Sequence, residues 1–397
     1  MKHERLKLLS FFLSFLVLLA VSSSAQQEPE VRHPFPLPAG LESAVEFWKK
    51  IFSEYGLAQL VYFNPLDPAK IYEVVDVGEE SRSNQYINSE RARIAAAHGV
   101  NIERVKAQRG VKERTAAGLK RSGRYIAQIQ QIFRDRGLPP ELSYLPVVES
   151  SYDIYARSSA GALGIWQFMR KTGAEYMRVT STVDERRDPI ESSRAAASYL
   201  QQAYEKLGSW PLAITSYNFG QAGMARAVAT VESNDLVNLI RSYDHPYFGF
   251  APKQFYAEFL AAVELGSNYQ KYFPGLELDA AAPIDEKELT ARTSIASLVN
   301  STGLNRQTLL AWNPALSAST TVVPAGYRVK LPRDRNSEPL IDVAEVPQVV
   351  HHRVKRGDTL LQIARRYGAS LQNILQANDL RKAHLIRVGT TLVIPKF

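Results

Sequence analysis

The chain has 397 residues, of which 45% are hydrophobic and 22% charged, as in globular rather than disordered proteins. This length exceeds what one ordinary hydrophobic core organises, so we expect two to four domains. Cysteine is absent, which excludes disulfides and lipid attachment at a cysteine, and the seven histidines are not spaced as metal ligands. We therefore expect no metal, no cofactor and a stability that depends on hydrophobic packing.

The first 25 residues have the pattern of a secretory signal peptide. Lys2, Arg5 and Lys7 give a positive start, an apolar run follows at 8–21, and small residues at 23–25 suit a cleavage site. The run is short for a membrane span, although an uncleaved anchor is the alternative. We predict a periplasmic protein with no transmembrane segment after cleavage.

The formal net charge of +8 is unevenly distributed along the chain. Residues 347–397 hold nine Lys/Arg against two Asp, so most of the excess lies in a short C-terminal part. A basic balance is compatible with nucleic acid. On an exported chain, however, a compact basic tail favours an anionic wall polymer or a membrane surface, and a solvated basic face without a partner is the alternative. We predict no nucleic-acid partner.

Residues 26–115 give the least specific pattern. A proline-rich lead at 26–40 precedes helical spacing of apolar residues at 41–62, and residues 69–76 alternate as a strand does. Helical spacing then dominates from 89 to 133. We predict a helical region of unknown role.

Residues 116–275 predict an almost wholly α-helical domain. Asp188, Pro189 and Glu191 form a typical helix start, with a cap, a proline and an acid in the first turn. Within this domain Glu149 follows Leu145 by four residues and Leu142 by seven, so the spacing places it on an apolar helical face. Burial raises the pKa of a carboxyl group and keeps it protonated, as a general acid requires. A surface glutamate at the edge of an apolar stripe is the alternative.

The C-terminal part contains an internal repeat. Residues 294–313 match residues 359–378 at an offset of 65, and the offset becomes 63 further on. Each copy predicts two short helices between short strands. We predict two small βααβ modules at 283–333 and 347–397, the first of them degenerate, joined by a polar linker at 333–345.

Several motifs carry a family resemblance. Residues 116–275 resemble the catalytic domain of the membrane-bound lytic murein transglycosylase D family, and residues 347–397 look like a LysM module. The motifs are Gly137-Leu138-Pro139-Pro140-Glu141-Leu142, Glu149-Ser150, Gly161-Ala162-Leu163-Gly164-Ile165-Trp166-Gln167-Phe168, Asp184-Glu185-Arg186-Arg187-Asp188-Pro189, Tyr217-Asn218-Phe219-Gly220 and Gly357-Asp358-Thr359. The resemblance implies a mainly α fold, with a goose-lysozyme-like domain followed by small α+β LysM modules.

The resemblance also implies roles for individual residues. Glu149 is the catalytic acid and then base, and the other residues of the cleft bind substrate. Those substrate-binding residues are Ser150, Gln167, Tyr217, Asn218 and Tyr256, and the glycan-binding residues of the LysM module are Gly357, Asp358 and Thr359.

Other readings of these residues are more structural. Ser150 also suits a hydroxyl bonded to the helix backbone, Trp166 suits the core, and Asp153 suits a turn better than a second catalytic carboxylate. A structural ion-pair or capping cluster is expected at Asp184, Arg187 and Asp188.

The implied activity is non-hydrolytic cleavage of the bond between N-acetylmuramic acid and N-acetylglucosamine in peptidoglycan, which leaves 1,6-anhydro ends. A hydrolase on the same fold is the first alternative, and a non-catalytic wall-binding scaffold is the second.

Overall fold

The computed structural model describes residues 34–78, 83–334, 339, 340, 346, 348–378, 380 and 386–396. The predicted signal peptide and most of the predicted linker lie outside these residues. Within the described part, no helix combines the length and the apolar character needed to cross a membrane.

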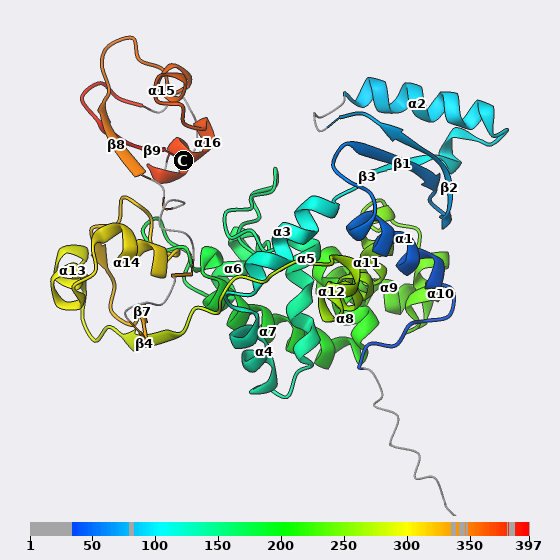
Figure 1. Ribbon diagram of the computed structural model, residues 1–397, viewed down its shortest axis with the longest axis horizontal. Helices are drawn as coiled ribbons and strands as arrows, with labels where there is room; N and C mark the ends of the chain where they lie inside the picture. The colour runs from blue at the N-terminus through cyan, green and yellow to red at the C-terminus, as the bar shows by residue number, and fades with distance from the viewer. Residues whose placement is uncertain are drawn as a thin grey trace, which may run out of the picture. The chain divides into compact units, whose positions relative to one another are not determined.

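The N-terminal region is not wholly helical, which corrects the prediction for residues 26–115. Helix α1 (Glu42–Ser53) packs on α11 of the helical domain, but a three-stranded antiparallel sheet follows in the order β2-β1-β3 (Figure 1). The elements of this part are β1 (Gln59–Asn64), β2 (Asp67–Asp76), α2 (Asn84–Ala97), η1 (Ile102–Arg104) and β3 (Lys106–Arg109). The strand expected at 69–76 is confirmed as the larger part of β2.

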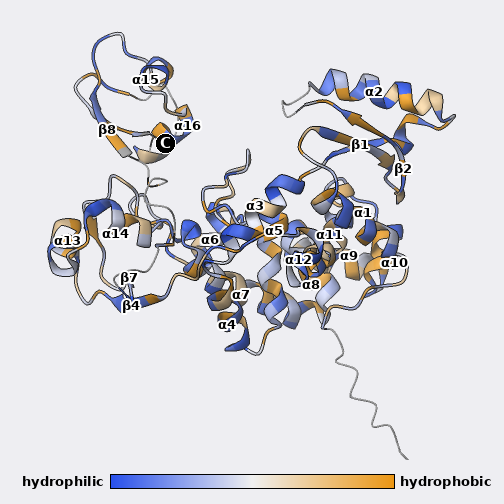
Figure 2. Cartoon of the chain, in the orientation of Figure 1, coloured by the Kyte–Doolittle hydropathy of each residue, from blue (hydrophilic) through white to orange (hydrophobic). Residues whose placement is uncertain are grey.

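Strand β1 explains why the sheet was missed. Leu60 and Tyr62 pack in a small cluster with residues of α2, while Val61 and Phe63 point to the other face and join the main core. A strand buried on both faces has no alternation of apolar and polar residues, so its sequence is indistinguishable from a buried helix. Figure 2 shows this run as apolar, beside the mixed surface of α2.

The middle of the chain is helical, as predicted. Helix α7 begins as its sequence indicates, because Asp188 Oδ1 accepts hydrogen bonds from the backbone N–H groups of Ile190 and Glu191 at 2.9 and 3.0 Å. The elements are α3 (Lys112–Ser122), α4 (Ile126–Arg134), η2 (Pro140–Tyr144), α5 (Leu145–Ser150), α6 (Arg170–Tyr176), η3 (Glu185–Arg187), α7 (Pro189–Leu207), α8 (Trp210–Phe219), α9 (Gln221–Val231), α10 (Leu236–Ser242), α11 (Phe250–Ser267) and α12 (Tyr269–Tyr272).

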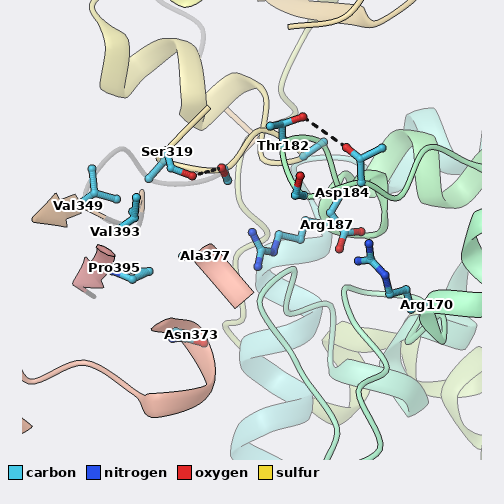
Figure 3. A pocket seen from close by; sticks show the side chains of 15 residues that line it. Arg170, Thr182, Asp184, Arg187, Ser319, Val349, Asn373, Ala377, Val393 and Pro395 are labelled. Carbon is cyan, nitrogen blue, oxygen red and sulfur yellow. Dashed lines mark hydrogen bonds between the residues drawn. The ribbon is translucent and has the colours of Figure 1, made fainter. Parts of the chain in front are cut away.

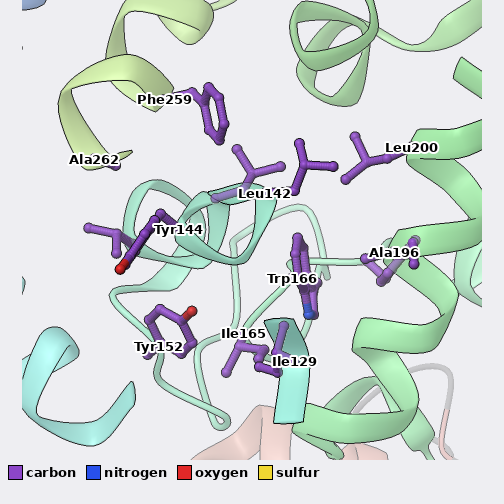
Figure 4. Packing of buried hydrophobic residues seen from close by; sticks show 14 of the residues in the cluster. Ile129, Leu142, Tyr144, Tyr152, Ile165, Trp166, Ala196, Leu200, Phe259 and Ala262 are labelled. Carbon is purple, nitrogen blue, oxygen red and sulfur yellow. The ribbon is translucent and has the colours of Figure 1, made fainter. Parts of the chain in front are cut away.

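The core of this helical domain surrounds Trp166. Its side chain is fully buried, and its indole N–H donates to the Ser193 hydroxyl at 2.8 Å. Figure 4 shows Leu142, Leu200 and Ile129 in the same packed cluster. The core interpretation of Trp166 is therefore confirmed, and the turn that carries it is fixed to α7.

The two copies of the C-terminal repeat, called here the first module (283–333) and the second module (347–397), make equivalent contacts. In the first, Asn313 bonds the backbone of Lys330 in both directions, and in the second Asn378 bonds Val393 in the same way. The first module contains β4 (Ile284–Glu288), β5 (Thr293–Ser294), α13 (Ile295–Thr302), α14 (Arg306–Trp312), β6 (Val322–Val323) and β7 (Arg328–Pro332), and the second contains β8 (Gln348–Arg353), α15 (Leu360–Tyr367), α16 (Leu371–Ala377) and β9 (Thr391–Lys396).

The first module is fixed to the helical domain, whereas the second has a hydrophobic cluster of its own. Lys330 of β7 is completely buried, with its ammonium 2.8 Å from the Asp188 carboxylate and 3.2 Å from that of Glu191, both at the start of α7. Burial lowers the pKa of Lys330, but the two carboxylates more than offset this effect and the net pKa is raised. The module therefore forms one body with α7 through buried charges.

Candidate active site

Glu149 lies near the end of the short helix α5, on the wall of the helical core. The apolar residues that precede it are buried, but they belong to two elements, because Leu142 lies in η2 while Leu145 and Pro146 lie in α5. The predicted single helical face is thus a 3-10 turn followed by an α turn. Desolvation raises the pKa of Glu149 from 4.5 to about 8. The carboxyl group is half-buried and is protonated at neutral pH, which is the state of a general acid.

The chain turns sharply directly after Glu149. Ser151 and Tyr152 both have positive φ, at 50° and 57°, so α5 cannot continue. Asp153 accepts a hydrogen bond from the backbone N–H of Tyr155 at 2.8 Å. The turn interpretation of Asp153 is confirmed.

Ser150 fixes α5 to the neighbouring turn at 161–168. Its hydroxyl donates to the carbonyl of Ile165 at 2.8 Å and lies 3.3 Å from the carbonyl of Pro146. The hydroxyl is therefore engaged with backbone, as in the structural interpretation, and contact with substrate stays a prediction.

Gln167 closes that turn in a constrained backbone conformation. Its φ is 48°, and its side-chain amide nitrogen donates to the carbonyls of Gly164 at 2.8 Å and Ala156 at 3.0 Å. The side-chain carbonyl oxygen accepts no hydrogen bond from a described residue. The amide nitrogen is already bonded, so Gln167 can offer a ligand its carbonyl oxygen as an acceptor. An acceptor of this kind suits the N–H of an N-acetyl sugar.

The turn needs glycine at position 164. Gly164 has φ of 80°, and a Cβ atom there would lie 1.7 Å from the carbonyl oxygen of Arg186. Arg186 in turn donates to the carbonyls of Gly161 and Phe168 at 3.3 and 3.1 Å. The segment 184–187 therefore supports the turn from behind.

Tyr217 of α8 also supports the turn. Its hydroxyl donates to the carbonyl of Trp166 at 2.8 Å, and its predicted contact with substrate stays a prediction. Burial first, and then the charge of Glu149, hold the pKa of Tyr217 well above its usual range, so the two side chains lie within electrostatic reach. Asn218, the next residue, is exposed and remains a predicted glycan contact.

Tyr256 is positioned differently from the expectation. Its ring is buried and packs on Phe259, and its hydroxyl donates to the carbonyl of Pro36 at 2.8 Å. The hydroxyl therefore binds the N-terminal segment and is not available to a substrate. This placement corrects the predicted role of Tyr256.

Glu258, two residues further along α11, is the functional candidate that the sequence reasoning missed. Burial, and then the charge of Glu149, raise the pKa of Glu258 to about 8. A second protonated carboxyl group therefore lies near the first. The signal was available in the sequence, because Glu258 is an acidic residue between Ala257 and Phe259 in an otherwise apolar helix.

The predicted LysM residues form a separate candidate site in the second module. Thr359 and Gln362 make a capping box at the start of α15, and Gly357 has φ of 88°. Asp358 accepts hydrogen bonds from the backbone N–H of Lys355 at 2.8 Å and from His352 at 2.7 Å, and these two contacts lower the pKa of its carboxyl group. The loop therefore caps α15, and its predicted contact with glycan stays a prediction.

The pKa of Glu149 leads to a prediction about stability. In the native protein this group binds its proton up to about pH 8, but in the unfolded chain only up to about pH 4.5. The native state therefore holds the extra proton between these values, and stability falls as the pH rises through that window. Because the side chain is half-buried, we expect a loss of about 1–3 kcal/mol.

Urea unfolding at pH 5.5 and at pH 8.5 measures this loss. Glu149→Gln has no proton to lose, so its stability should change less between the two pH values than that of the wild type. An equal change in both proteins would contradict the assigned pKa. The stability of the double variant Glu149→Gln/Glu258→Gln should change still less between the two pH values, because the pKa of Glu258 is raised in the same direction.

Comparison with known proteins agrees with this geometry. A family model described as a transglycosylase SLT domain matches residues 127–240, and a LysM domain model matches residues 352–395. Membrane-bound lytic murein transglycosylase D from Escherichia coli K12, and the same protein from a second strain, is 29% identical over 290 residues, which cover 68% of this chain and 63% of the relative. This chain therefore matches a little under two thirds of the length of those relatives.

A solved structure gives a more distant match. An inactive mutant of the lytic transglycosylase Slt from Pseudomonas aeruginosa aligns with 19% identity and a TM-score of 0.31, over 38% of this chain and 25% of that one. The two matched stretches thus place a transglycosylase SLT domain in the helical region and a LysM domain in the C-terminal module.

Proposed function

We propose that this protein is a peptidoglycan lytic transglycosylase that uses Glu149 as its one catalytic carboxyl group. The observation that carries the proposal is the protonated, half-buried Glu149 beside the turn that presents Gln167. The matching SLT domain and the murein transglycosylase relatives support the same activity.

The chemistry follows from the protonated state. Glu149 donates its proton to the oxygen that joins N-acetylmuramic acid to N-acetylglucosamine, and the bond from that oxygen to muramic C1 breaks. The resulting carboxylate accepts the proton of the muramic C6 hydroxyl, whose oxygen attacks C1. The product is a 1,6-anhydro sugar, no water is consumed, and Glu149 is protonated again.

Product mass distinguishes this activity from hydrolysis. Digestion of purified peptidoglycan by the full chain should give anhydro ends, which are one water lighter than reducing ends. Products with reducing ends alone would indicate the hydrolase alternative, and an absence of products would indicate the scaffold alternative.

We also propose that the second module retains the enzyme on the wall in the periplasm. Its LysM match and its basic sequence support binding to an anionic glycan polymer. Its own hydrophobic cluster supports the proposed domain limits 347–397, and we propose the limits 116–275 and 283–333 from the sequence pattern.

Deletion of residues 347–397 tests this role. We expect retention on insoluble wall to fall several-fold, with a larger difference at low salt because the basic charge then acts over a longer range. A sedimentation assay at two salt concentrations measures the bound fraction, and turnover of short soluble glycan should be unchanged. Equal retention of the truncated and full chains would contradict a targeting role.

A further inference from the structure

A second carboxyl group, that of Glu258 on α11, lies beside α5 and has no part in the chemistry proposed above. Tyr144, the residue directly before α5, packs on Gly266 near the end of α11, where a Cβ atom would lie 2.3 Å from the tyrosine ring. Helix α11 ends one residue later, at Ser267. Helix α5 therefore packs on the part of α11 that precedes Gly266.

Helical spacing places Glu258 on the face of α11 that makes this contact. Residues four apart share a helical face, so Glu258, Ala262 and Gly266 form one row. Figure 4 shows Ala262 and Phe259 in the packed cluster that also contains Tyr144. This row is therefore packed against η2 and α5, and Glu258 is its acidic, half-buried member.

The same geometry brings Glu258 close to Glu149. Glu258 lies eight residues before Gly266, about 12 Å along α11, and Glu149 lies five residues after Tyr144, about 8 Å along α5. Both distances start from the contact between Tyr144 and Gly266. The charge of Glu149 is accordingly the second cause, after burial, of the raised pKa of Glu258.

Neither carboxyl group has a polar partner in the part of the chain that the structure describes. Glu149 and Glu258 form no hydrogen bond or ion pair with a described residue, and hydrogen bonding is not among the causes of either pKa shift. Buried polar groups are normally paired, and a half-buried acid without a partner costs stability. Packing alone therefore does not explain an acid at position 258.

The titratable groups on the elements packed around α5 and α11 do not account for the pKa shifts of the two carboxyl groups. The causes are burial for Glu149, and burial followed by the charge of Glu149 for Glu258. The surrounding groups include Tyr217 of α8, Arg121 of α3, Glu141 and Tyr144 of η2, Lys49 of α1 and Glu264 of α11 itself.

The charged cluster behind the turn at 161–168 is also separate from this pair. Both oxygens of Asp184 accept hydrogen bonds from Arg186, at 2.9 and 2.7 Å, so the structural ion pair expected for Asp184 and Arg187 is made with Arg186. Figure 3 shows Arg170 and Arg187 near Asp184. None of these charges is a cause of the pKa shift of either carboxyl group.

We propose that Glu258 is a positioning residue that holds the proton of Glu149 in place. Whichever of two neighbouring carboxyl groups ionises first opposes the ionisation of the other, and this effect is reciprocal. The pair therefore releases its protons in two steps, and Glu149 keeps its proton to a higher pH than it would beside a neutral residue. This inference rests on the proposed transglycosylase function, in which Glu149 begins each cycle protonated.

The pH profile of kcat/KM tests this role, because its alkaline limb reports the loss of the catalytic proton from the free enzyme. Anhydro ends formed by the full chain are counted by mass spectrometry at each pH. In Glu258→Gln no charge can form beside Glu149, so the alkaline limb should move to lower pH. For a coupling of about one pK unit, the expected displacement is about 0.5 pH unit.

Two further variants separate this effect from a general change of charge or folding. Glu264→Gln makes the same substitution on the same helix, at a side chain that is 41% accessible, and its alkaline limb should coincide with that of wild type. Glu258→Asp keeps a carboxyl group and should restore part of the displacement. Thermal unfolding of each variant across the pH range limits the comparison to conditions in which the protein is folded.

A titration without substrate provides a second measurement. In the full chain labelled with carbon-13 at the glutamate carboxyl groups, the NMR signal of Glu149 is the one that Glu149→Gln lacks. The midpoint of its titration should fall in Glu258→Gln by the same amount as the alkaline limb.

Two outcomes would overturn the inference. These are a limb and a Glu149 midpoint that stay at their wild-type values in Glu258→Gln, or an equal displacement in Glu264→Gln. In both cases anhydro ends from wild type would leave the proposed function standing. If wild type gave no anhydro ends, the proposed function itself would fail, while the NMR midpoint would still measure the effect of Glu258 on the Glu149 proton.

Discussion

Replacement of Glu149 by glutamine is expected to lower turnover of peptidoglycan by about 10²–10⁴-fold. Glutamine has a similar size and still fills the half-buried position at the end of α5, but it has no proton to donate near neutral pH. The other groups of the turn do not replace it, because Ser150 and Tyr217 already donate to backbone carbonyls. The loss should appear in kcat, since the amide keeps the shape of the binding surface.

The measurement is the rate of anhydro-end formation, together with binding to insoluble wall. Binding should be retained in Glu149→Gln while turnover is lost. Glu175→Gln is the matched control, because it makes the same change at an exposed position on α6 and should leave the rate unchanged. Activity of Glu149→Gln equal to that of wild type would reject the assignment.

Replacement of Lys330 by alanine is expected to destabilise the protein by about 3–5 kcal/mol. Lys330 is completely buried, and its removal leaves the buried Asp188 carboxylate without this ion pair, whereas Glu191 keeps Arg194 and Arg328. Asp188 also caps α7, so the uncompensated charge lies at the junction of the first module and the helical domain. We expect the midpoint of urea unfolding to lie at a lower urea concentration than in the wild type. Thermal unfolding measures the same loss of stability.

Arg333 provides the control for this prediction within the same module. Its ion pair with Asp285 is exposed, with about 60% of each side chain accessible. Exposed pairs contribute little, so Arg333→Ala should cost at most about 1 kcal/mol. Similar losses in the two variants would show that the buried position of Lys330 is not what makes its ion pairs important.

A fixed first module also changes how the repeat is interpreted. Thr293-Ser294 stands where the second module has Asp358-Thr359, and Lys330 stands where the second has Val393. At this position, therefore, the first copy carries a cation that joins it to α7. The sequence predicted a degenerate copy, and the contacts of Lys330 in the structure pack this copy on the start of α7.

The sequence by itself determined the parts of this protein that depend on local spacing. Helical periodicity predicted the α domain, the Asp188 cap predicted the start of α7, and the repeat predicted two βααβ modules. The spacing around Glu149 predicted a carboxyl group on an apolar face, and burial in the folded protein does raise its pKa.

Only the tertiary structure decided the features that depend on contacts between distant segments. The N-terminal sheet was missed because β1 is buried on both faces, and the proximity of Glu258 to Glu149 arises only when α11 packs on α5. Tyr256 was predicted to bind substrate, but its hydroxyl donates to the carbonyl of Pro36, which is 220 residues away in sequence. Periodicity reports which face of an element is apolar, whereas the partner of that face is set by the packing of the whole chain.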